Sequence, residues 1–445
     1  MRQKSKSEVS HSQIFHLAWP MIISNLTVPL LGIVDTAILG HLDNSIYLAA
    51  VATGSGLLTF LLWSFGFLKM GTSGIVARAY GAKDFNQIIA CLWQSGTLAL
   101  VLGVALLGVQ WLLFPVLIKL INPNPEVFPL ALEYAQIRML AAPFTLANYV
   151  IVGWFIGRQN TKIPLLLLVV INVLNIIFDY AFIVGWDLKS EGAAWASVLA
   201  DVLGCLLGLV LIYRFLLNDG IELKVPFASV FNKSAFRKLF QINSDLFIRT
   251  SFLLGVLLFF NSQSARLGQD ILSANAILLQ IVAVISYGLD GFAHAAEALV
   301  GKATGAKDDR AFQSACVKSG IWALITAIAL SIVLLIGQSS IIQLFTDIPS
   351  VMAVAEQYYF WLIGFALVSF LGYHLDGIFI GWGEVKFMRI SMIFCTLGVF
   401  FPVWYLTQSM GNHGLWLAFL LFNFFRGVSL LVFLNSKKRI NLGVI

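Results

Sequence analysis

The chain has 445 residues, of which 59% are apolar and only 11% charged, and its mean hydropathy is +0.88. A membrane span takes about 20 apolar residues, so about 12 spans fit and leave only loops and tails besides. This composition indicates an integral membrane protein and excludes a large soluble domain. The four cysteines are scattered through apolar stretches without CxxC or histidine pairing, so we expect small core residues and no metal site.

Twelve apolar runs, each longer than a strand, follow one another along the chain. Several contain Gly or Pro, which membrane helices tolerate when neighbouring helices satisfy the freed backbone groups. We therefore predict an all-α polytopic membrane protein, with first-half spans near residues 14–39, 46–70, 87–113, 127–155, 162–186 and 192–216. The second half has predicted spans near residues 238–262, 271–300, 312–338, 351–380, 387–409 and 414–435.

The basic residues indicate how these spans are oriented. Lys and Arg gather in the N-terminal segment, around the connections that follow even-numbered spans and at the C-terminus, whereas the opposite face carries only Lys119, Lys189 and Arg266. Because basic connections stay in the cytoplasm, both termini are predicted to be cytoplasmic, in the inner (plasma) membrane. Topology thus explains the formal net charge of +6 without a nucleic-acid partner.

The two halves of the chain resemble each other in sequence. A shift of 224 residues places Gly81-Ala82-Lys83-Asp84 on Gly305-Ala306-Lys307-Asp308, and the same shift aligns Phe155-Ile156-Gly157 with Phe379-Ile380-Gly381. We predict an N-lobe (1–217), a cytoplasmic linker (218–236) and a C-lobe (237–445). With six spans each, the lobes enter the membrane from the same side, so a pseudo-twofold axis along the membrane normal is expected to relate them.

Acids within predicted spans are costly in lipid, which makes each one a functional candidate. The first half has three such acids, Asp35, Asp179 and Asp201. Polar neighbours share a helical face with two of them: Asn172 and Asn175 with Asp179, and Ser197 with Asp201. These groups form either a cation-coupling cage or a structural hydrogen-bond network; we favour coupling for Asp35 and Asp179 and leave Asp201 open.

The second half has its own polar cluster, which consists of Asp245, Arg249, Asp290, His294, Glu297 and Asp376. These residues lie toward the predicted cytoplasmic ends of their spans. The repeat places Phe259 at the position of Asp35, so the outer acid of the first half has no counterpart there. We favour an ion-paired structural or gating cluster over a second coupling site.

Motifs for catalysis or nucleotide binding are incomplete. The segment from Gly301 to Lys307 resembles a Walker A loop, but Ala306 occupies the position that requires glycine and no Ser or Thr follows Lys307. No HExxH or GxSxG pattern occurs. We therefore expect neither an enzyme nor a bound cofactor.

Several stretches together resemble the multidrug and toxic compound extrusion (MATE) family, and specifically its DinF-like branch. They are Asp35-Thr36-Ala37-Ile38-Leu39-Gly40-His41, the segment from Asn175 to Asp179, Glu191-Gly192-Ala193-Ala194-Trp195-Ala196, the segment from Leu289 to Glu297, and Val300-Gly301-Lys302. The resemblance covers essentially the whole chain. It implies twelve helices in two six-helix lobes and export of cationic and amphiphilic drugs by cation antiport.

The same resemblance assigns roles to individual residues. It implies that Asp35 and Asp179 are the coupling acids, with Asn175, Ser197 and Tyr134 as polar neighbours, and that Pro20 bends the first span. The departure at Phe259 argues against the sodium site of the NorM branch.

We therefore predict a monomeric secondary active exporter that exchanges drugs for protons by alternating access of its two lobes. Sodium coupling, and a flippase for lipid-linked oligosaccharides, are the alternatives. A static kink at Pro20 remains the alternative to a moving hinge.

Overall fold

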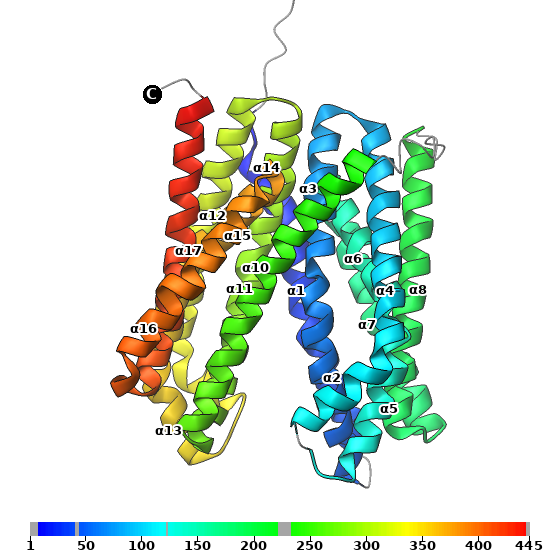
Figure 1. Cartoon of the computed structure of the whole chain (residues 1–445), viewed down its shortest axis with the longest axis vertical. Coiled ribbons are helices and arrows are strands. Elements are labelled where there is room, and N and C mark those ends of the chain that lie inside the picture. The colour runs from blue at the N-terminus through cyan, green and yellow to red at the C-terminus, as the bar shows by residue number, and fades with distance from the viewer. Residues whose placement is uncertain (1–7, 41–43, 122, 221–232, 442–445) are drawn as a thin grey trace, which may run out of the picture. The chain divides into compact units, whose positions relative to one another are not determined.

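The computed structural model describes residues 8–40, 44–121, 123–220 and 233–441, with the side chains of 28–31, 33, 35, 36 and 437–441 left out. Every element in this part of the chain is a helix, and no strand occurs in it (Figure 1). Apolar residues dominate nearly every helix on all sides, as expected of helices surrounded by lipid and by one another. The all-α fold is as predicted.

The helices of the first half are α1 (His11–Gly40), α2 (Ser45–Trp63), η1 (Ser64–Gly66), α3 (Phe67–Ala82), α4 (Phe85–Ile121), α5 (Val127–Met139), α6 (Ala142–Gly157), α7 (Lys162–Asp179), η2 (Tyr180–Gly185) and α8 (Lys189–Asn218). Those of the second half are α10 (Lys233–Leu267), α11 (Gln269–Gly305), α12 (Asp309–Gln343), α13 (Pro349–Tyr358), α14 (Phe360–Trp382), α15 (Val385–Phe394), η3 (Cys395–Phe400), α16 (Phe401–Leu406), η4 (Gln408–Met410) and α17 (Asn412–Asn441).

Each predicted span coincides with one of these helices or with a broken pair of them. Among the described residues, ten helices are long and apolar enough to cross a membrane, and there are eleven if α5 and α6, which meet at 50°, are counted together as one span. The remaining predicted span, near 14–39, falls on the 30-residue helix α1. The bend in the span predicted at 127–155 was not anticipated from the sequence.

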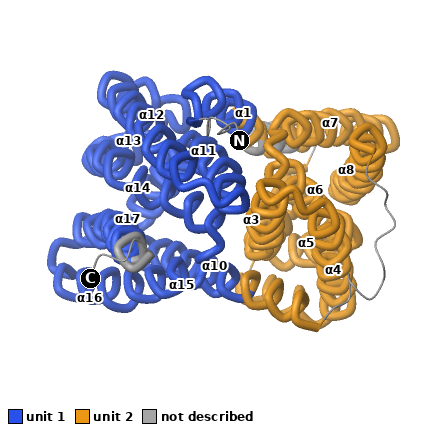
Figure 2. The backbone as a smooth tube through the Cα atoms, turned by 90° about the horizontal axis from the view of Figure 1, so that it is seen from above, with its two compact units in different colours: residues 1–22, 244–445 blue, residues 23–243 orange. Residues whose placement is uncertain are grey.

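The chain forms two compact units, which Figure 2 shows in different colours. Unit 1 contains residues 1–22 and 244–445, and unit 2 contains residues 23–243. Both α1 and α10 therefore pass from one unit into the other. Most of the predicted linker, residues 221–232, lies outside the described residues, and the predicted lobe boundaries stay a prediction.

Within unit 1, the start of α1 and the end of α17 lie at the same end of the unit (Figure 1). An even number of membrane crossings between two points of a chain places both points on the same side of the membrane.

The internal repeat appears as matching close contacts within the two units. In unit 2, α6 approaches α3 so closely at Gly153 and Gly157 that any Cβ there would meet the carbonyl oxygens of Lys69 and Ser73. In unit 1, α14 approaches α11 in the same way at Gly377 and Gly381, against the carbonyls of Ala293 and Glu297. All four contacts follow the 224-residue shift. Glycines four residues apart let membrane helices pack backbone to backbone, so each unit has the same tightly packed helix pair.

The repeated Gly-Ala-Lys-Asp turn has the same geometry in both halves. Lys83 and Lys307 adopt left-handed backbone conformations, with φ of 58° and 53°, and end α3 and α11. The aspartate that follows then caps the next helix: Asp84 Oδ1 accepts from the amide of Gln87 at 3.0 Å, and Asp308 Oδ1 from that of Ala311 at 3.1 Å. The aligned sequences therefore encode the same turn.

Candidate functional site

The first predicted coupling acid, Asp35, lies on α1 in unit 2, five residues before the helix ends at Gly40. Its side chain lies outside the described residues. The geometry of the site therefore rests on α7 and α8.

Asp179 is the last residue of α7, and its side chain is fully buried. The six residues that follow, Tyr180–Gly185, form the π-helix η2. The rings of Phe178, Phe182 and Trp186 stack along one side of this segment, with centroids 5.7 and 5.0 Å apart. π-Helical segments in membrane and soluble helices are frequent at functional sites.

Asn175 lies between Asp179 and Ser197, and its amide has two orientations with different consequences. With the amide nitrogen toward the acid, Asn175 donates to Asp179 Oδ2 at 2.9 Å and accepts from the Ser197 hydroxyl at 3.0 Å and amide at 3.2 Å. With the amide reversed, the nitrogen donates to Ser197 Oγ at 3.0 Å and the oxygen faces Asp179 Oδ2.

The first orientation suits an ionised Asp179, because a carboxylate only accepts hydrogen bonds. The second suits a protonated Asp179, which donates to the amide oxygen. An amide nitrogen and an amide oxygen occupy nearly the same space, so the orientation follows from the donors and acceptors around them. Only the first orientation also gives the Ser197 amide an acceptor, so the contact favours the ionised form of Asp179.

Asn172 points elsewhere along the same helix. Its amide nitrogen donates to the backbone carbonyl of Thr27 on α1, at 3.3 Å, within unit 2. The predicted polar face of α7 therefore contacts both α8, through Asn175, and α1, through Asn172.

Asp201 belongs to a separate ion pair. Its Oδ2 lies 2.9 Å from an Arg138 guanidinium nitrogen and accepts from the Thr145 hydroxyl at 2.6 Å. Asn148 donates to the Asp201 backbone carbonyl at 3.1 Å. The predicted neighbour Tyr134 lies one turn from Arg138 on α5, buried against Gly54 of α2. These contacts favour the structural interpretation of Asp201 and place Tyr134 beside this pair.

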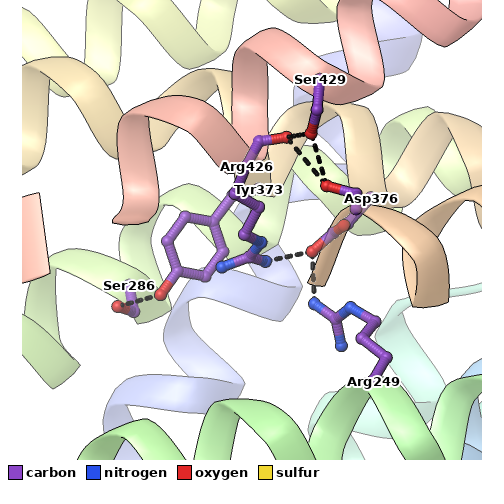
Figure 3. Close-up of polar contacts among 7 residues, drawn as sticks. Arg249, Ser286, Tyr373, Asp376, Arg426 and Ser429 are labelled. Atoms are coloured by element: carbon purple, nitrogen blue, oxygen red, sulfur yellow. Dashed lines mark hydrogen bonds and ion pairs between the residues drawn. The ribbon is translucent and has the colours of Figure 1, made fainter. Parts of the chain in front are cut away.

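The polar cluster of unit 1 centres on Asp376 (Figure 3). Asp376 Oδ2 accepts from guanidinium nitrogens of both Arg249 on α10 and Arg426 on α17. The Arg426 guanidinium carbon also lies 4.9 Å from the centre of the Tyr373 ring, and the Tyr373 hydroxyl lies 2.6 Å from Ser286 Oγ. All three charged groups are nearly inaccessible, so one carboxylate joins α10, α14 and α17.

The other acids of this cluster differ in whether their partner lies on the same helix or on another one. Asp245 pairs at 2.5 Å with Arg389 on α15, rather than with Arg249 one turn away. Glu297 lies 3.1 Å from His294 Nδ1, and Asp290 is half-buried on the same helix. Asp245 and Asp376 thus contact arginines on other helices, whereas Glu297 contacts a residue of its own helix, and the role of the cluster stays a prediction.

Two arginines of these networks were absent from the predicted sites, Arg138 and Arg426, of which Figure 3 shows Arg426. Both lie inside predicted spans, where a cation requires an acidic partner. That rule was the available signal: Arg138 pairs with Asp201, and Arg426 pairs with Asp376.

Phe259, the repeat counterpart of Asp35, is surrounded by aromatic rings in unit 1. Its ring centroid lies 5.8, 5.0 and 4.7 Å from those of Phe400, Phe401 and Trp404, edge to face in each case. These aromatic rings have no carboxylate oxygen that could bind a cation. The structural environment thus agrees with the loss of an acid there.

Comparisons with known proteins agree with this architecture. The family model described as MatE matches residues 20–181 and 247–406, once in each half. The chain is 38% identical over 429 residues to "DNA damage-inducible protein F" of Escherichia coli strain K12, covering 95% of this chain and 91% of that protein. It is 25% identical to "Probable multidrug resistance protein NorM" of Photorhabdus laumondii, covering 96% of each chain. A crystal structure of MATE in the bent conformation superposes with a TM-score of 0.85 at 21% identity, covering 98% of each chain.

Proposed function

Because this chain belongs to the MatE family of membrane transporters, we propose that it exports cationic and amphiphilic drugs in exchange for protons. The family consists of transporters rather than enzymes. The name of the NorM relative supports drugs as the substrate class. The resemblance of the sequence to the DinF-like branch supports protons as the coupling ion.

The observation that carries the proton assignment is the contact between Asp179 and Asn175. A fully buried acid is costly to ionise unless its charge is hydrogen-bonded. Asn175 donates to the ionised form at 2.9 Å, whereas the reversed amide, which would accept from a protonated Asp179, places its nitrogen 3.2 Å from the Ser197 amide donor. In this proposal protonation of Asp179 is accompanied by a 180° rotation of the Asn175 amide, which links the charge of the acid to the contact with Ser197 on α8.

Asp35 is the second member of the proposed coupling pair. If both acids share one site, they titrate as a coupled pair rather than independently. Protonation of this pair and drug binding then exclude each other, and alternating access of the two lobes exposes the site to each side of the membrane in turn. In this proposal the protein lies in the inner membrane with both termini in the cytoplasm, because the basic residues gather on that side.

Exchange of one proton for one monovalent cationic drug moves no net charge, so the pH difference alone would drive it. The test uses purified protein in liposomes, with ethidium as the transported probe and imposed gradients of pH or sodium. Ethidium efflux is expected to stop when the pH difference is collapsed. Efflux that requires a sodium gradient and does not depend on the pH difference would contradict proton coupling. Transport of lipid-linked oligosaccharide without transport of ethidium would favour the flippase.

Substitution of the acids tests the residues. Asp35→Asn and Asp179→Asn should each abolish pH-driven efflux while the protein remains folded, because an amide forms hydrogen bonds but carries no exchangeable charge. Wild-type efflux from either variant at equal protein amounts would remove that residue from the coupling site. Asp201→Asn serves as the comparison variant. Because Asp201 pairs with Arg138, this substitution should first lower the stability of the protein.

A further inference from the structure

A small pocket lies in unit 1 where three of the membrane spans end. α10 ends at Leu267, the span of α15, η3 and α16 ends at Leu406, and α17 begins at Asn412. Residues near these three points line the pocket, which has a volume of about 260 Å³. α17 runs for 30 residues from here to Asn441, so the pocket lies at the end of the unit opposite the C-terminus, where Figure 1 shows α16. Because membrane helices end near the lipid headgroups, the pocket lies at headgroup depth.

Three polar side chains line the pocket. Gln263 and Arg266 come from α10, and Gln408 comes from η4. Within the described part of the chain, none of these three side chains has a hydrogen bond or an ion pair. The acid nearest to Arg266 along the chain is Asp270, in the first turn of α11, and it does not line the pocket. The pocket therefore offers one guanidinium and two amides to a ligand.

The first turn of α17 adds to the positive character of the pocket. Gly411 lines the pocket and immediately precedes this helix. The first amides of a helix have no acceptor within it and lie at the positive end of its dipole, which favours anions. Arg266, in the last turn of α10, offsets the negative end of that helix. A negatively charged group is thus the ligand that the pocket favours.

Buried contacts behind the pocket hold its walls together. Asn275 of α11 donates to Ser264 Oγ of α10 at 2.7 Å and exchanges hydrogen bonds of 2.8 and 3.0 Å with Asn412 of α17. α16 and α17 meet so closely that a Cβ at Gly414 would lie 2.2 Å from the Thr407 carbonyl oxygen. None of these contacts uses the polar side chains that line the pocket. The site is therefore formed before a ligand binds, which lowers the cost of binding.

Exposed apolar side chains lie on the same elements as the pocket. Tyr405 and Leu406 on α16 have 70% and 78% of their surface exposed, and Met410 in η4 has 50%. Trp404 lines the pocket itself, and its ring packs edge to face on that of Phe259, with centroids 4.7 Å apart. Trp and Tyr are enriched where membrane helices meet the headgroups. Side chains that suit lipid thus border a pocket that suits an anion.

We propose that this pocket binds the phosphate group of a phospholipid, with Arg266 as the main partner. Two guanidinium N–H groups match two phosphate oxygens, and Gln263 and Gln408 donate further hydrogen bonds. The acyl chains lie along Tyr405 and Leu406. Sites for drug-sized ligands have volumes of about 300 to 1,000 Å³, so this pocket suits a headgroup better than a drug. The inference depends neither on the transported substrate nor on the coupling ion.

The first experiment measures phospholipid binding by native mass spectrometry. Delipidated protein in detergent is titrated with dioleoyl phosphatidylglycerol, and the population with one bound lipid gives an apparent Kd. Arg266→Gln keeps a polar side chain but removes the charge, so the Kd should rise by about tenfold or more. Lys119→Gln, at an exposed position in the last turn of α4, is the matched control and should leave the Kd unchanged. A wild-type Kd in Arg266→Gln, or an equal rise in the control, would overturn the proposal.

Two further ligands separate the phosphate from the rest of the lipid. Dioleoylglycerol has the same chains without a phosphate, and glycerol 3-phosphate has the phosphate without chains. Both are expected to bind more weakly than dioleoyl phosphatidylglycerol. Dioleoylglycerol that binds as tightly would show that the chains alone are recognised. Glycerol 3-phosphate that binds as tightly would assign the pocket to a soluble phosphate ester. Either result would overturn a phospholipid site.

The second experiment locates the bound lipid. A phosphatidylglycerol with a photoreactive diazirine in its headgroup is cross-linked to the protein, and the labelled peptides are identified. The label is expected on residues 263–267 or 404–415, and it should be lost in Arg266→Glu, where the new carboxylate repels the phosphate. Label confined to other residues, or equally strong label in Arg266→Glu, would overturn the proposal.

Discussion

The hydrogen bond between Asn175 and Asp179 gives the sharpest prediction, because it joins a neutral side chain to the proposed proton carrier. In Asn175→Leu the side chain keeps a similar size but loses both its donor and its acceptor. Only Asp179 and Ser197 lose a partner within this contact. The expected effect is therefore on proton exchange rather than on the packing of α7 against α8.

The magnitude follows from the two charge states. A hydrogen bond to an ionised group contributes about 1.5 to 3 kcal/mol, and one between neutral groups about 0.5 to 1.5 kcal/mol. Loss of both therefore costs the ionised state about 1 to 1.5 kcal/mol more than the protonated state. At 1.36 kcal/mol per pH unit, the pH at half-maximal efflux should rise by about one unit.

The assay is ethidium efflux from proteoliposomes at a series of pH values, with the profile of Asn175→Leu compared with that of the wild type. Asn423→Leu is the matched control, since Asn423 is a buried amide in unit 1 that donates to the Phe419 carbonyl of its own helix. It should leave the midpoint unchanged. An unchanged midpoint in Asn175→Leu, with a normal maximal rate, would refute the proposed exchange of hydrogen bonds, and a downward shift would show that Asn175 favours the protonated acid.

Three further changes test other parts of the structure. Pro20→Ala should restore a helix hydrogen bond and lower the efflux rate without altering ethidium affinity; an unchanged rate would mean a passive kink. Asp376→Leu leaves two buried guanidiniums without their shared acceptor, so thermal unfolding in detergent should show a loss of about 3 to 5 kcal/mol, and a smaller loss than in Asp376→Asn would contradict this account. Gly377→Ala places a methyl group against the Ala293 carbonyl and should destabilise the protein by about 1 to 3 kcal/mol in the same assay, whereas a neutral effect would mean that α14 can shift away from α11.

The spans and the polar face of α7 were predictable because both follow from local periodicity. Residues three and four apart share a helical face, so Asn172, Asn175 and Asp179 had to lie on one side of α7 if the segment was helical. The repeat was predictable for a similar reason, since equal sequences at Lys83 and Lys307 produce equal turns.

The partners of the buried charges were not predictable in this way. Asp376 and Arg426 are 50 residues apart, and Asp245 and Arg389 are 144 apart, so each pair depends on which helices become neighbours. Hydropathy shows that a charge is inside the membrane but not which helix faces it. The 50° bend between α5 and α6, in contrast, has a local cause in Pro143, which lies in the first turn of α6 and cannot donate to the Met139 carbonyl one turn back.

The π-helix that follows Asp179 bears on how a proton reaches a carboxyl group with no accessible surface. In a π-helix each amide bonds to a carbonyl five residues back, so the turn is wider and less favourable than in α7. Backbone of this kind opens more readily, and water that enters there arrives one residue from Asp179. Amides of Tyr180–Gly185 should therefore exchange with deuterium faster than those of residues 165–178, and a water path through η2 would let the acid gain or lose its proton while α7 itself stays intact.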